Sequence, residues 1–583
     1  MTRPYPMLLV LPMVACALLT PRLAPGQSLQ MTAGDAGPAM LHWQDSAFAL
    51  PAALDVTRVT TGDPSVAATT DIAAADLPLD GARREVSDGG RRIVTTYRWG
   101  SVACFYELSG DRLQIALTIE NRGDRPIVDF SAQLLQLTLP ATPEGWDKPR
   151  RRVARSLDNL AMHKLTVGDA RLIACIDTLY PPLALTLEAP AGAAPLTVPV
   201  VLSAGVPTVD PDAPRVAPRG LWVVPPGQSK TAVVSLRFAA AGTPDAQVLG
   251  DLYAGFRELY PAPPRWPDRR PIGMLMLPSG GAGKSPTNPR GWFKKKDLDV
   301  TTDAGRAQFR AEMLAWADRA VKSMQAFDAQ GGIVWNVEGE ENPHPITYIG
   351  DPRMLPTFAP EMDAVADEFF QKFRDAGLRT GVTIRPTQVY LKGEKWAHGT
   401  GSQMAARNPL EEDYASVHPE GLAEWGFFPT AERLSRKIEY AQRRWGCTIF
   451  YIDTNGIFAP VEAGKDFKWM LIAGSVLREL RERHPDVLII PELMRDDFTW
   501  RLTNYAYAAP YMELDLKGYG TPAAVRDIYP DAFSVVNIAD GPIEEQRGVL
   551  VEAVRRGDIL MTRGWFGDHR NAIVKSIYDE AGR

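Results

Sequence analysis

Two acidic side chains stand where continuous apolar runs end. Asp453 follows Thr448-Ile449-Phe450-Tyr451-Ile452 and precedes the turn sequence Thr454-Asn455-Gly456, and Glu492 follows Val487-Leu488-Ile489-Ile490-Pro491, 39 positions further on. Runs of this length and composition are typical of buried β-strands. In a parallel barrel the active site lies at the carboxyl ends of the strands. A lone Asp there is as readily explained as a turn cap, but two successive strands that each end in an acid indicate a catalytic pair.

This pair suits glycoside hydrolysis, which needs one carboxylate to attack the sugar or activate water and another to protonate the leaving oxygen. Glu492 is flanked by the apolar Pro491 and Leu493, which favour a protonated acid. Asp453 precedes hydroxyl, amide and backbone donors, which favour a carboxylate. We therefore expect Asp453 to be the nucleophile and Glu492 the acid/base. No cysteine or histidine cluster lies near these strand ends, so we expect neither a metal nor another cofactor.

Other polar and aromatic residues at the predicted strand ends are candidates for substrate binding. Arg385 closes the third strand, where it could bind a substrate hydroxyl or carboxylate, or form a salt bridge with a neighbouring acid. The remaining candidates are Trp335, Asn336 and Glu338 after the second strand, Glu513 and Asp515 after the sixth, Asp540 after the seventh, and Arg563 and Trp565 after the eighth.

Apolar strands and amphipathic helices alternate from residue 271 to residue 583, which predicts a (β/α)8 TIM barrel as the catalytic domain. On one helix, Leu434, Ile438, Ala441 and Trp445 recur at helical spacing, which indicates a face buried in the core. We expect the eight strands at residues 272–277, 332–337, 380–384, 448–452, 487–490, 509–512, 533–538 and 558–562. We expect helices at residues 307–329, 361–376, 431–445, 468–483, 543–556 and 569–580.

Residues 27–260 show short alternating runs and hardly any helical periodicity, which predicts an N-terminal antiparallel β-sandwich. Residues 261–270 are rich in proline and predict a stiff linker between this domain and the barrel. The β-sandwich could bind carbohydrate or complete the substrate cleft, or it could serve only as a platform for the barrel. The chain is thus expected to be a multidomain protein with a β-sandwich followed by a TIM barrel.

Residues 1–26 predict a signal peptide, because Met7 to Leu19 is apolar yet too short to cross a bilayer and Ala24-Pro25-Gly26 offers small residues for cleavage. We expect a periplasmic or secreted protein cleaved after Gly26, with a lipoprotein anchored through Cys16 as the alternative. No later segment is long and apolar enough to predict a stable membrane span.

Charge and cysteine content indicate which kinds of partner and cross-link to expect. The formal net charge is −6, 23% of the residues are charged, and no basic block or stripe is present, which argues against nucleic acid. Cys104, Cys175 and Cys447 would remain after cleavage, too few for a disulfide framework and without metal-ligand spacing. Cys104 and Cys175 lie in the same half of the chain and could pair.

Tyr451-Ile452-Asp453 on the fourth strand and Glu492 on the fifth resemble the retaining α-glycosidase barrels. The α-amylase superfamily and the endo-α-N-acetylgalactosaminidases are similar in placing an Asp nucleophile and a Glu acid/base on these strands, and the latter also have a large β-sandwich before the barrel. The α-galactosidase and α-glucosidase barrels share the fourth-strand Asp but place the acid on the sixth, which would be Glu513 or Asp515. Asp540 lacks the preceding histidine motif of the α-amylases.

The resemblance implies a secreted glycoside hydrolase that cleaves an α-glycosidic bond with retention of configuration. The substrate would be an oligosaccharide, a polysaccharide or a glycoconjugate. Two alternatives stay open at this point: an inverting glycosidase, and a non-catalytic carbohydrate-binding or scaffold protein built on a degenerate barrel. A Glu492 side chain directed away from Asp453 would favour the scaffold.

Overall fold

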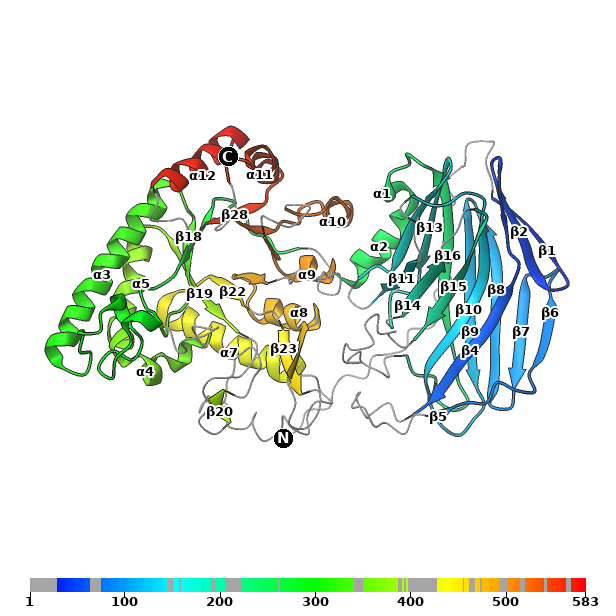
Figure 1. The fold of residues 1–583 in the computed structure, drawn as a ribbon, viewed down its shortest axis with the longest axis horizontal. Helices are drawn as coiled ribbons and strands as arrows, with labels where there is room; N and C mark the ends of the chain where they lie inside the picture. The colour runs from blue at the N-terminus through cyan, green and yellow to red at the C-terminus, as the bar shows by residue number, and fades with distance from the viewer. Residues whose placement is uncertain are drawn as a thin grey trace.

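The computed structural model consists of a body of antiparallel sheets and a barrel of parallel strands, which lie side by side (Figure 1). The predicted signal peptide and Cys16 lie outside the described residues. The structure describes residues 29–62, 75–144, 146, 150–156, 159–181, 183–189, 194–204, 222–260, 263–339, 350–385, 391–392, 395–396, 427–453, 456–460, 467–471, 474–492, 502–513, 520–538, 543–562 and 568–583.

The antiparallel body contains two sheets, as the alternating runs predict. The nine-stranded sheet runs in the order β1-β2-β3-β10-β15-β14-β11, with β4 paired to β10 and β5 paired to β4. Its strands are β1 (Gln30–Gly34), β2 (Gly37–Trp43), β3 (Ser46–Ala49), β4 (Ala53–Thr61), β5 (Ala75–Asp76), β10 (Ile127–Leu139), β11 (Arg150–Arg155), β14 (Ala184–Ala189) and β15 (Leu196–Ser203).

The second sheet has seven strands in the order β12-β13-β16-β9-β8-β7-β6. On β9, buried and half-buried residues alternate without a break, so one face of the sheet packs inward. The strands are β6 (Arg83–Ser87), β7 (Arg92–Tyr97), β8 (Gly100–Ser109), β9 (Arg112–Asn121), β12 (Met162–Val167), β13 (Ala170–Ile176) and β16 (Ser229–Ala240).

The two antiparallel sheets share one hydrophobic core. The rings of Trp43 and Phe238 stack across it with centroids 6.3 Å apart, and the Tyr106 hydroxyl of one sheet donates to the Leu134 carbonyl of the other at 2.6 Å.

Cys104, Cys175 and Cys447 are free and buried, so Cys104 and Cys175 do not pair. Burial raises the pKa of each thiol to about 12.

Eight parallel strands form a nearly closed barrel in the order β25-β22-β19-β18-β17-β28-β27-β26. A parallel bridge between Glu492 and Tyr511, and a hydrogen bond of 3.0 Å from Ala509 N to Ile489 O, join the two outer strands. The strands are β17 (Ile272–Leu275), β18 (Gly331–Val334), β19 (Arg379–Ile384), β22 (Ile449–Ile452), β25 (Leu488–Pro491), β26 (Tyr511–Glu513), β27 (Val535–Asn537) and β28 (Ile559–Thr562). Each lies within or beside a predicted strand.

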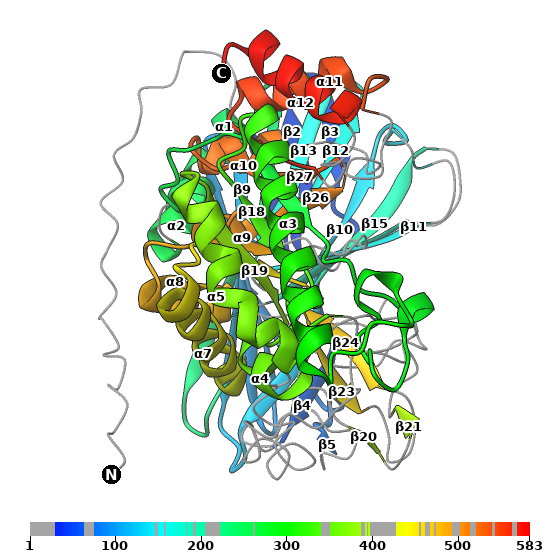
Figure 2. The same ribbon diagram turned by 90° about the vertical axis from the view of Figure 1, so that its left-hand side faces the viewer.

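Helices in the connections between these strands cover the outside of the barrel, where α3, α5, α7 and α8 lie in front in Figure 2. The predicted apolar face of α7 is confirmed, because Leu434, Ile438, Ala441 and Trp445 are all fully buried. The helices are α3 (Asp303–Ala326), α4 (Leu355–Phe358), α5 (Pro360–Asp375), α7 (Phe427–Trp445), α8 (Gly474–Arg483), α9 (Leu502–Tyr507), α10 (Ala523–Ile528), α11 (Arg547–Arg555) and α12 (Asp568–Ala581), with short 3-10 turns η1 (Gly281–Gly283), η2 (Trp292–Lys294) and η3 (Pro352–Met354).

Two small hairpins follow barrel strands, and one of them corrects a prediction. β20 (Leu391–Lys392) pairs with β21 (Lys395–Trp396), and β23 (Gly456–Pro460) pairs with β24 (Phe467–Leu471). The helix predicted for residues 468–483 is wrong over its first part, because β24 occupies those residues and α8 begins at Gly474. Figure 1 shows β20 and β23 at the same end of the barrel.

The segment predicted as a linker packs against the barrel over its described part. Trp266 is 8% exposed, joins the cluster of residues that fills the barrel interior, and donates from Nε1 to Gln330 Oε1 at 2.8 Å. Arg379, at the start of β19, lies over the Trp266 ring at 4.8 Å. Trp266 therefore closes the amino end of the barrel.

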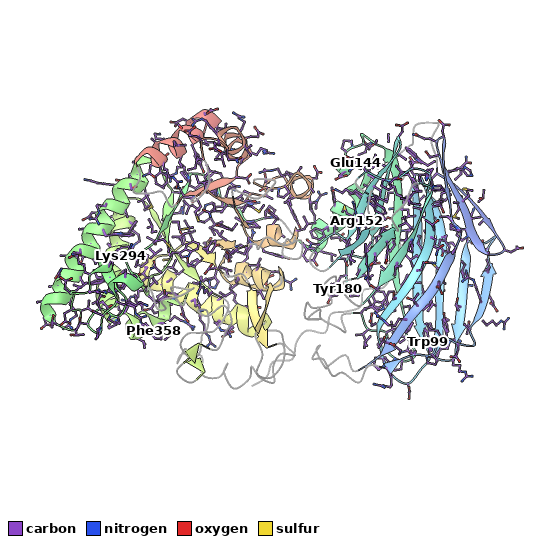
Figure 3. The ribbon with its side chains drawn as sticks, viewed as in Figure 1. Trp99, Glu144, Arg152, Tyr180, Lys294 and Phe358 are labelled. Carbon is purple, nitrogen blue, oxygen red and sulfur yellow. The ribbon has the colours of Figure 1, made fainter. Side chains whose placement is uncertain are left out.

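Two helices after the last antiparallel strand contact the barrel. α1 (Asp245–Val248) and α2 (Gly250–Leu259) fall inside the range predicted as β-sandwich. The Tyr529 hydroxyl donates to the Tyr260 carbonyl at 2.6 Å, and Leu502 N donates to Asn159 Oδ1 at 2.7 Å. Tyr180, which is 64% exposed, lies at the edge of the antiparallel body that faces the barrel (Figure 3). No helix in the described ranges has the length and apolar character needed to cross a membrane.

Candidate active site

The residues inside the barrel strands alternate, and this alternation directs Asp453 and Glu492 toward the barrel axis. Ile449 and Tyr451 of β22 belong to the interior cluster, and so do Leu488 and Ile490 of β25. Side chains two positions apart in a strand point to the same face. Asp453 continues the first series and Glu492 the second, so both acids lie at the carboxyl end of the barrel.

Asp453 and Glu492 occupy neighbouring positions on adjacent strands. Ile452 pairs with Pro491 in the parallel ladder, and Glu492 N continues the ladder with a hydrogen bond of 3.1 Å to Ile452 O. Adjacent strands are about 4.8 Å apart in the hydrogen-bonding direction. The backbones of the two acids therefore stand one strand spacing apart, with both side chains on the same face.

Arg385 stands on the other side of Asp453 and forms an ion pair with it. Ile384 pairs with Ile452, and Asp453 N donates to Ile384 O at 2.9 Å, so the three strand ends are in register. Arg385 donates from Nε at 2.7 Å and from Nη2 at 2.5 Å to Asp453 Oδ2. The two side chains are only 4% and 13% exposed. Of the two roles open to Arg385 from the sequence, the structure contains the salt bridge to a neighbouring acid.

Aromatic rings form the floor beneath these acids. The Trp335 and Tyr451 rings have centroids 4.3 Å apart, and the Tyr451 and Tyr511 rings meet edge to face at 5.3 Å. Asn537 Nδ2 donates to the Tyr511 hydroxyl. Tyr451 and Tyr511 are buried, whereas Trp335 is half-buried, so part of the Trp335 side chain is exposed.

Two other candidates from the second strand are enclosed by protein. Asn336 is 3% exposed, accepts from Leu277 N at 2.8 Å and donates to Ser279 Oγ at 2.9 Å, so its amide fixes the loop after β17. Glu338 is 1% exposed, and its Oε1 accepts from Asp351 N at 2.6 Å. Burial raises the pKa of Glu338 to about 7, and its Oε2 has no hydrogen-bond partner among the described residues.

Of the candidates from the sixth, seventh and eighth strands, only Glu513 lies within the described residues. Glu513 is the last residue of β26, where it pairs in register with Asn537. Asp515, Asp540, Arg563 and Trp565 lie outside the described residues.

The structure adds residues that the sequence reasoning missed. Lys437 of α7 is 1% exposed and donates from Nζ to the Arg385 carbonyl at 2.8 Å. Its ammonium also lies 3.7 Å from Asp351 Oδ2, and Gly350 O accepts from Arg385 N at 3.0 Å. A signal for Lys437 existed, because it interrupts the apolar face of α7 three residues after Leu434. Asp351 and Gly350 had no such signal.

The described residues at this mouth include the neighbouring acids Asp453 and Glu492. Among the described residues, no group of three or more His, Cys, Asp or Glu side chains could hold a metal ion. Two neighbouring acids, an arginine and an aromatic floor can bind a polar ring, attack it and move a proton.

Neither the protein-family models nor the curated protein sequences contain a match to this chain. Among solved structures, it is similar to the α-N-acetylgalactosaminidase NagBb from Bifidobacterium bifidum, with 11% identity, a TM-score of 0.47, and coverage of 95% of this chain and 92% of that one. It is also similar to the GH36 α-galactosidase AgaA from Geobacillus stearothermophilus (11%, 0.39, 95% and 77%) and to the α-galactosidase TtGalA from Thermus thermophilus (11%, 0.35, 85% and 99%). All three TM-scores are below 0.5, so these similarities assign no function by themselves.

Proposed function

We propose that this protein is a secreted or periplasmic glycoside hydrolase that cleaves an α-glycosidic bond with retention of configuration. The observation that carries the proposal is the pairing of Asp453 and Glu492 on adjacent parallel strands, with Ile452 opposite Pro491. Glycoside hydrolysis requires two carboxyl groups that flank the bond to be cleaved, and adjacent positions at a barrel mouth can supply them.

In this proposal the chain divides as its sequence predicts. A signal peptide of residues 1–26 precedes a β-sandwich of residues 27–260, a linker of residues 261–270, and a (β/α)8 TIM barrel of residues 271–583 that carries the chemistry. The β-sandwich serves as a platform, since α2 and the Tyr260 carbonyl anchor it to the barrel through Tyr529.

The mechanism assigns one role to each acid. Asp453 attacks the anomeric carbon and forms a glycosyl-enzyme ester, while Glu492 gives its proton to the departing glycosidic oxygen. Glu492 then takes a proton from water, the resulting hydroxide attacks the anomeric carbon, and Asp453 leaves as a carboxylate. The two inversions at that carbon restore its original configuration.

The spacing of the strands favours retention over inversion. Retaining enzymes hold their two carboxyl groups about 5–5.5 Å apart, whereas inverting enzymes separate them by about 6.5–9.5 Å to admit a water molecule. Side chains on facing positions of adjacent strands start from backbones about 4.8 Å apart. Half-buried Trp335, which the sequence predicts as a binding residue, offers a ring face on which a sugar can stack.

The scaffold alternative is less well supported by the geometry. A degenerate barrel would not need Glu492 beside Asp453, yet the ladder aligns them and alternation turns both inward. The remaining enzymatic question is whether the acid is Glu492 or Glu513, because Glu513 ends β26, the sixth strand, on which the α-galactosidase and α-glucosidase barrels place their acid.

The test begins with nitrophenyl α-glycosides of common hexoses and N-acetylhexosamines, and with the wild-type protein, Asp453→Asn and Glu492→Gln. Asp453→Asn keeps the shape of the side chain and removes the nucleophile, so turnover should fall to background while sugar binding, measured by calorimetry, persists. The anomer of the first product, read by proton NMR, should match that of the substrate.

The acid is identified by its dependence on the leaving group. Glu492→Gln should slow substrates with poor leaving groups much more than nitrophenyl glycosides, which need little proton assistance. Added azide should partly rescue Glu492→Ala and give a glycosyl azide of retained configuration. Glu513→Gln is the matched control, and a leaving-group dependence in that variant instead would move the acid to the sixth strand. Near-full activity of Asp453→Asn would overturn the proposal.

A further inference from the structure

A buried lysine lies behind the candidate nucleophile, on a helix rather than on a strand. Lys437 of α7 is 1% exposed, although its neighbours on that face, Leu434, Ile438 and Ala441, are apolar and fully buried. An ammonium group is expensive to remove from water, and it is retained in a core only where specific partners compensate. The contacts of Lys437 therefore indicate what it is kept for.

Lys437 connects an anion to the backbone of Arg385. Its Nζ donates to the Arg385 carbonyl at 2.8 Å and lies 3.7 Å from Asp351 Oδ2. Arg353 donates to both oxygens of Asp351, at 2.9 Å and 2.7 Å. Burial would raise the pKa of Asp351, but the Lys437 ammonium and the Arg353 guanidinium outweigh it and lower that pKa. Asp351 is therefore a fixed, charged anchor for the lysine.

The Arg385 backbone is held on both sides. Gly350 O accepts from Arg385 N at 3.0 Å, while Lys437 binds the Arg385 carbonyl. Gly350 also adjoins the Arg385 side chain so closely that an added Cβ would lie 2.7 Å from Arg385 Cγ. Glu338 Oε1 accepts from Asp351 N at 2.6 Å and so fixes the segment that contains both Gly350 and Asp351. The guanidinium at the other end of this arrangement binds Asp453 Oδ2.

We propose that Lys437 and Asp351 are positioning residues that orient Asp453 through Arg385. This inference rests on the proposed role of Asp453 as the nucleophile. A carboxylate must approach the anomeric carbon along a narrow range of directions, and small displacements of a reacting group cost large factors in rate. By fixing the carbonyl of Arg385, Lys437 fixes the direction of its side chain and thereby the carboxylate that the side chain holds. Neither Lys437 nor Asp351 touches the sugar.

The test is a double-mutant cycle between Lys437 and Arg385. Lys437→Met keeps the length of the stem and removes the ammonium, and Arg385→Lys keeps a cation but changes the contact with Asp453. Lys437→Met alone should lower kcat on a nitrophenyl glycoside by about 10- to 100-fold with little change in KM. In the Arg385→Lys background the same substitution should lower kcat by less than about 2-fold, because the path to Asp453 is already broken.

A matched control comes from the same helix. Ser435, which is 1% exposed, hydrogen-bonds His484 Nε2 at 2.8 Å. Ser435→Ala should lower the unfolding midpoint without changing kcat. If Lys437→Met does not fold, Asp351→Asn takes its place, since it removes the anchor charge while keeping the shape, and it should lower kcat in the wild-type background only.

The outcomes separate this inference from the proposed function. Unchanged kcat in Lys437→Met, or equal losses in both backgrounds, would mean that the lysine is merely structural and would overturn the inference. A wild-type protein that cleaves no glycoside would instead overturn the proposed function. In that case a crystal structure of Lys437→Met still decides the positioning, which requires the Arg385 guanidinium to leave Asp453 Oδ2.

Discussion

The two ends of the barrel contain arginine–aspartate pairs whose acids are similarly buried, at 13% for Asp453 and 16% for Asp268, but whose arginines differ in exposure. At the carboxyl end, the paired side chains of Arg385 and Asp453 are 4% and 13% exposed. At the amino end, the side chains of Arg270 and Arg379 are 45% and 41% exposed and lie around an open hollow of about 400 Å³, with Asp268 as their shared partner.

This difference in arginine exposure distinguishes a buried ion pair, which can hold a side chain in place, from ion pairs at the surface. Exposed pairs contribute between nothing and about 1 kcal/mol, because water and salt screen them. Breaking a buried pair costs about 3–5 kcal/mol, because one charge is left without compensation. At the amino end Arg374 donates to the Trp445 carbonyl at the end of α7, which is a structural role at a helix terminus. At the carboxyl end the network leads to Asp453, the proposed nucleophile.

The largest expected effect comes from removing an arginine at each end. Arg385→Met should lower the free energy of unfolding by about 3–5 kcal/mol and kcat on a nitrophenyl glycoside by about 100-fold or more, because Asp453 loses its partner and its orientation. Arg379→Met should cost less than about 1 kcal/mol, since its ion pair with Asp268 is 3.9 Å long and the arginine side chain is 41% exposed. Denaturant titrations and steady-state kinetics measure both. Similar losses at the two ends would contradict the comparison.

The next effect is a pH dependence of stability at Glu338. Its pKa is raised from 4.5 to about 7 by burial, so the favourable neutral form is fully present below about pH 4.5 and is lost as the pH rises through 7. This shift corresponds to about 3 kcal/mol of stability lost at high pH. Relative to wild type, Glu338→Gln should gain stability between about pH 5 and about pH 8, as measured by unfolding at each pH.

Asp268 at the amino end is the control for that experiment, and its pH dependence has the opposite sign. Burial raises the pKa of Asp268, but hydrogen bonds and charge from Arg270 outweigh it and lower that pKa. Its contribution is therefore present above the pKa of the unfolded chain and is lost as the pH falls. Asp268→Asn should be less stable than wild type at neutral pH and equal to it in acid. A Glu338→Gln profile that parallels this one would refute the burial of a neutral Glu338.

A smaller effect distinguishes two glycines with nearly the same backbone conformation. Gly350 has φ of 73° and Gly377 has φ of 75°, so alanine should cost about 1–2 kcal/mol at either position. A Cβ at Gly350 would lie 2.7 Å from Arg385 Cγ, whereas nothing lies within 4 Å of a Cβ at Gly377. Only Gly350→Ala should also displace Arg385 and lower kcat, by about 10-fold. Equal kinetics for the two alanine variants would show that the fit around Arg385 does not matter.

The barrel strands could be predicted from the sequence, because their apolar runs are long and end abruptly. The fourth strand, expected at residues 448–452, is β22 (Ile449–Ile452). The helix expected from residue 468 could not be separated from β24 (Phe467–Leu471), because that strand exists through its pairing with β23 and not through its own periodicity. The burial of Trp266 could not be predicted from its proline-rich segment either, since that burial depends on the barrel that Trp266 closes.

The candidate site divides in the same way. Asp453 and Glu492 could be placed together from the sequence, because strand ends in a parallel barrel converge at one mouth. For Arg385 the sequence left two roles open, and only burial beside Asp453 distinguishes them. Lys437 and Asp351 reach Arg385 from a helix and from a connecting segment, and no local pattern encodes such a meeting. The sequence signal for this network is Lys437 itself, a lysine within an apolar helical face.

The smallest expected effect is at Arg270, at the amino end of the barrel. Arg270 donates to both oxygens of Asp268 and lies 3.2 Å from Asp328 Oδ1, whereas Arg385 donates to one oxygen of Asp453. The Arg270 side chain nevertheless remains 45% exposed, so solvent already screens each contact. Arg270→Gln should therefore change the free energy of unfolding by less than about 1 kcal/mol, and the change should shrink further in about 1 M salt because the Debye length falls to about 3 Å. Its kcat should equal that of wild type. A loss at high salt as large as that of Arg385→Met would mean that hydrogen-bond geometry, and not burial, sets the strength of the charged pairs in this barrel.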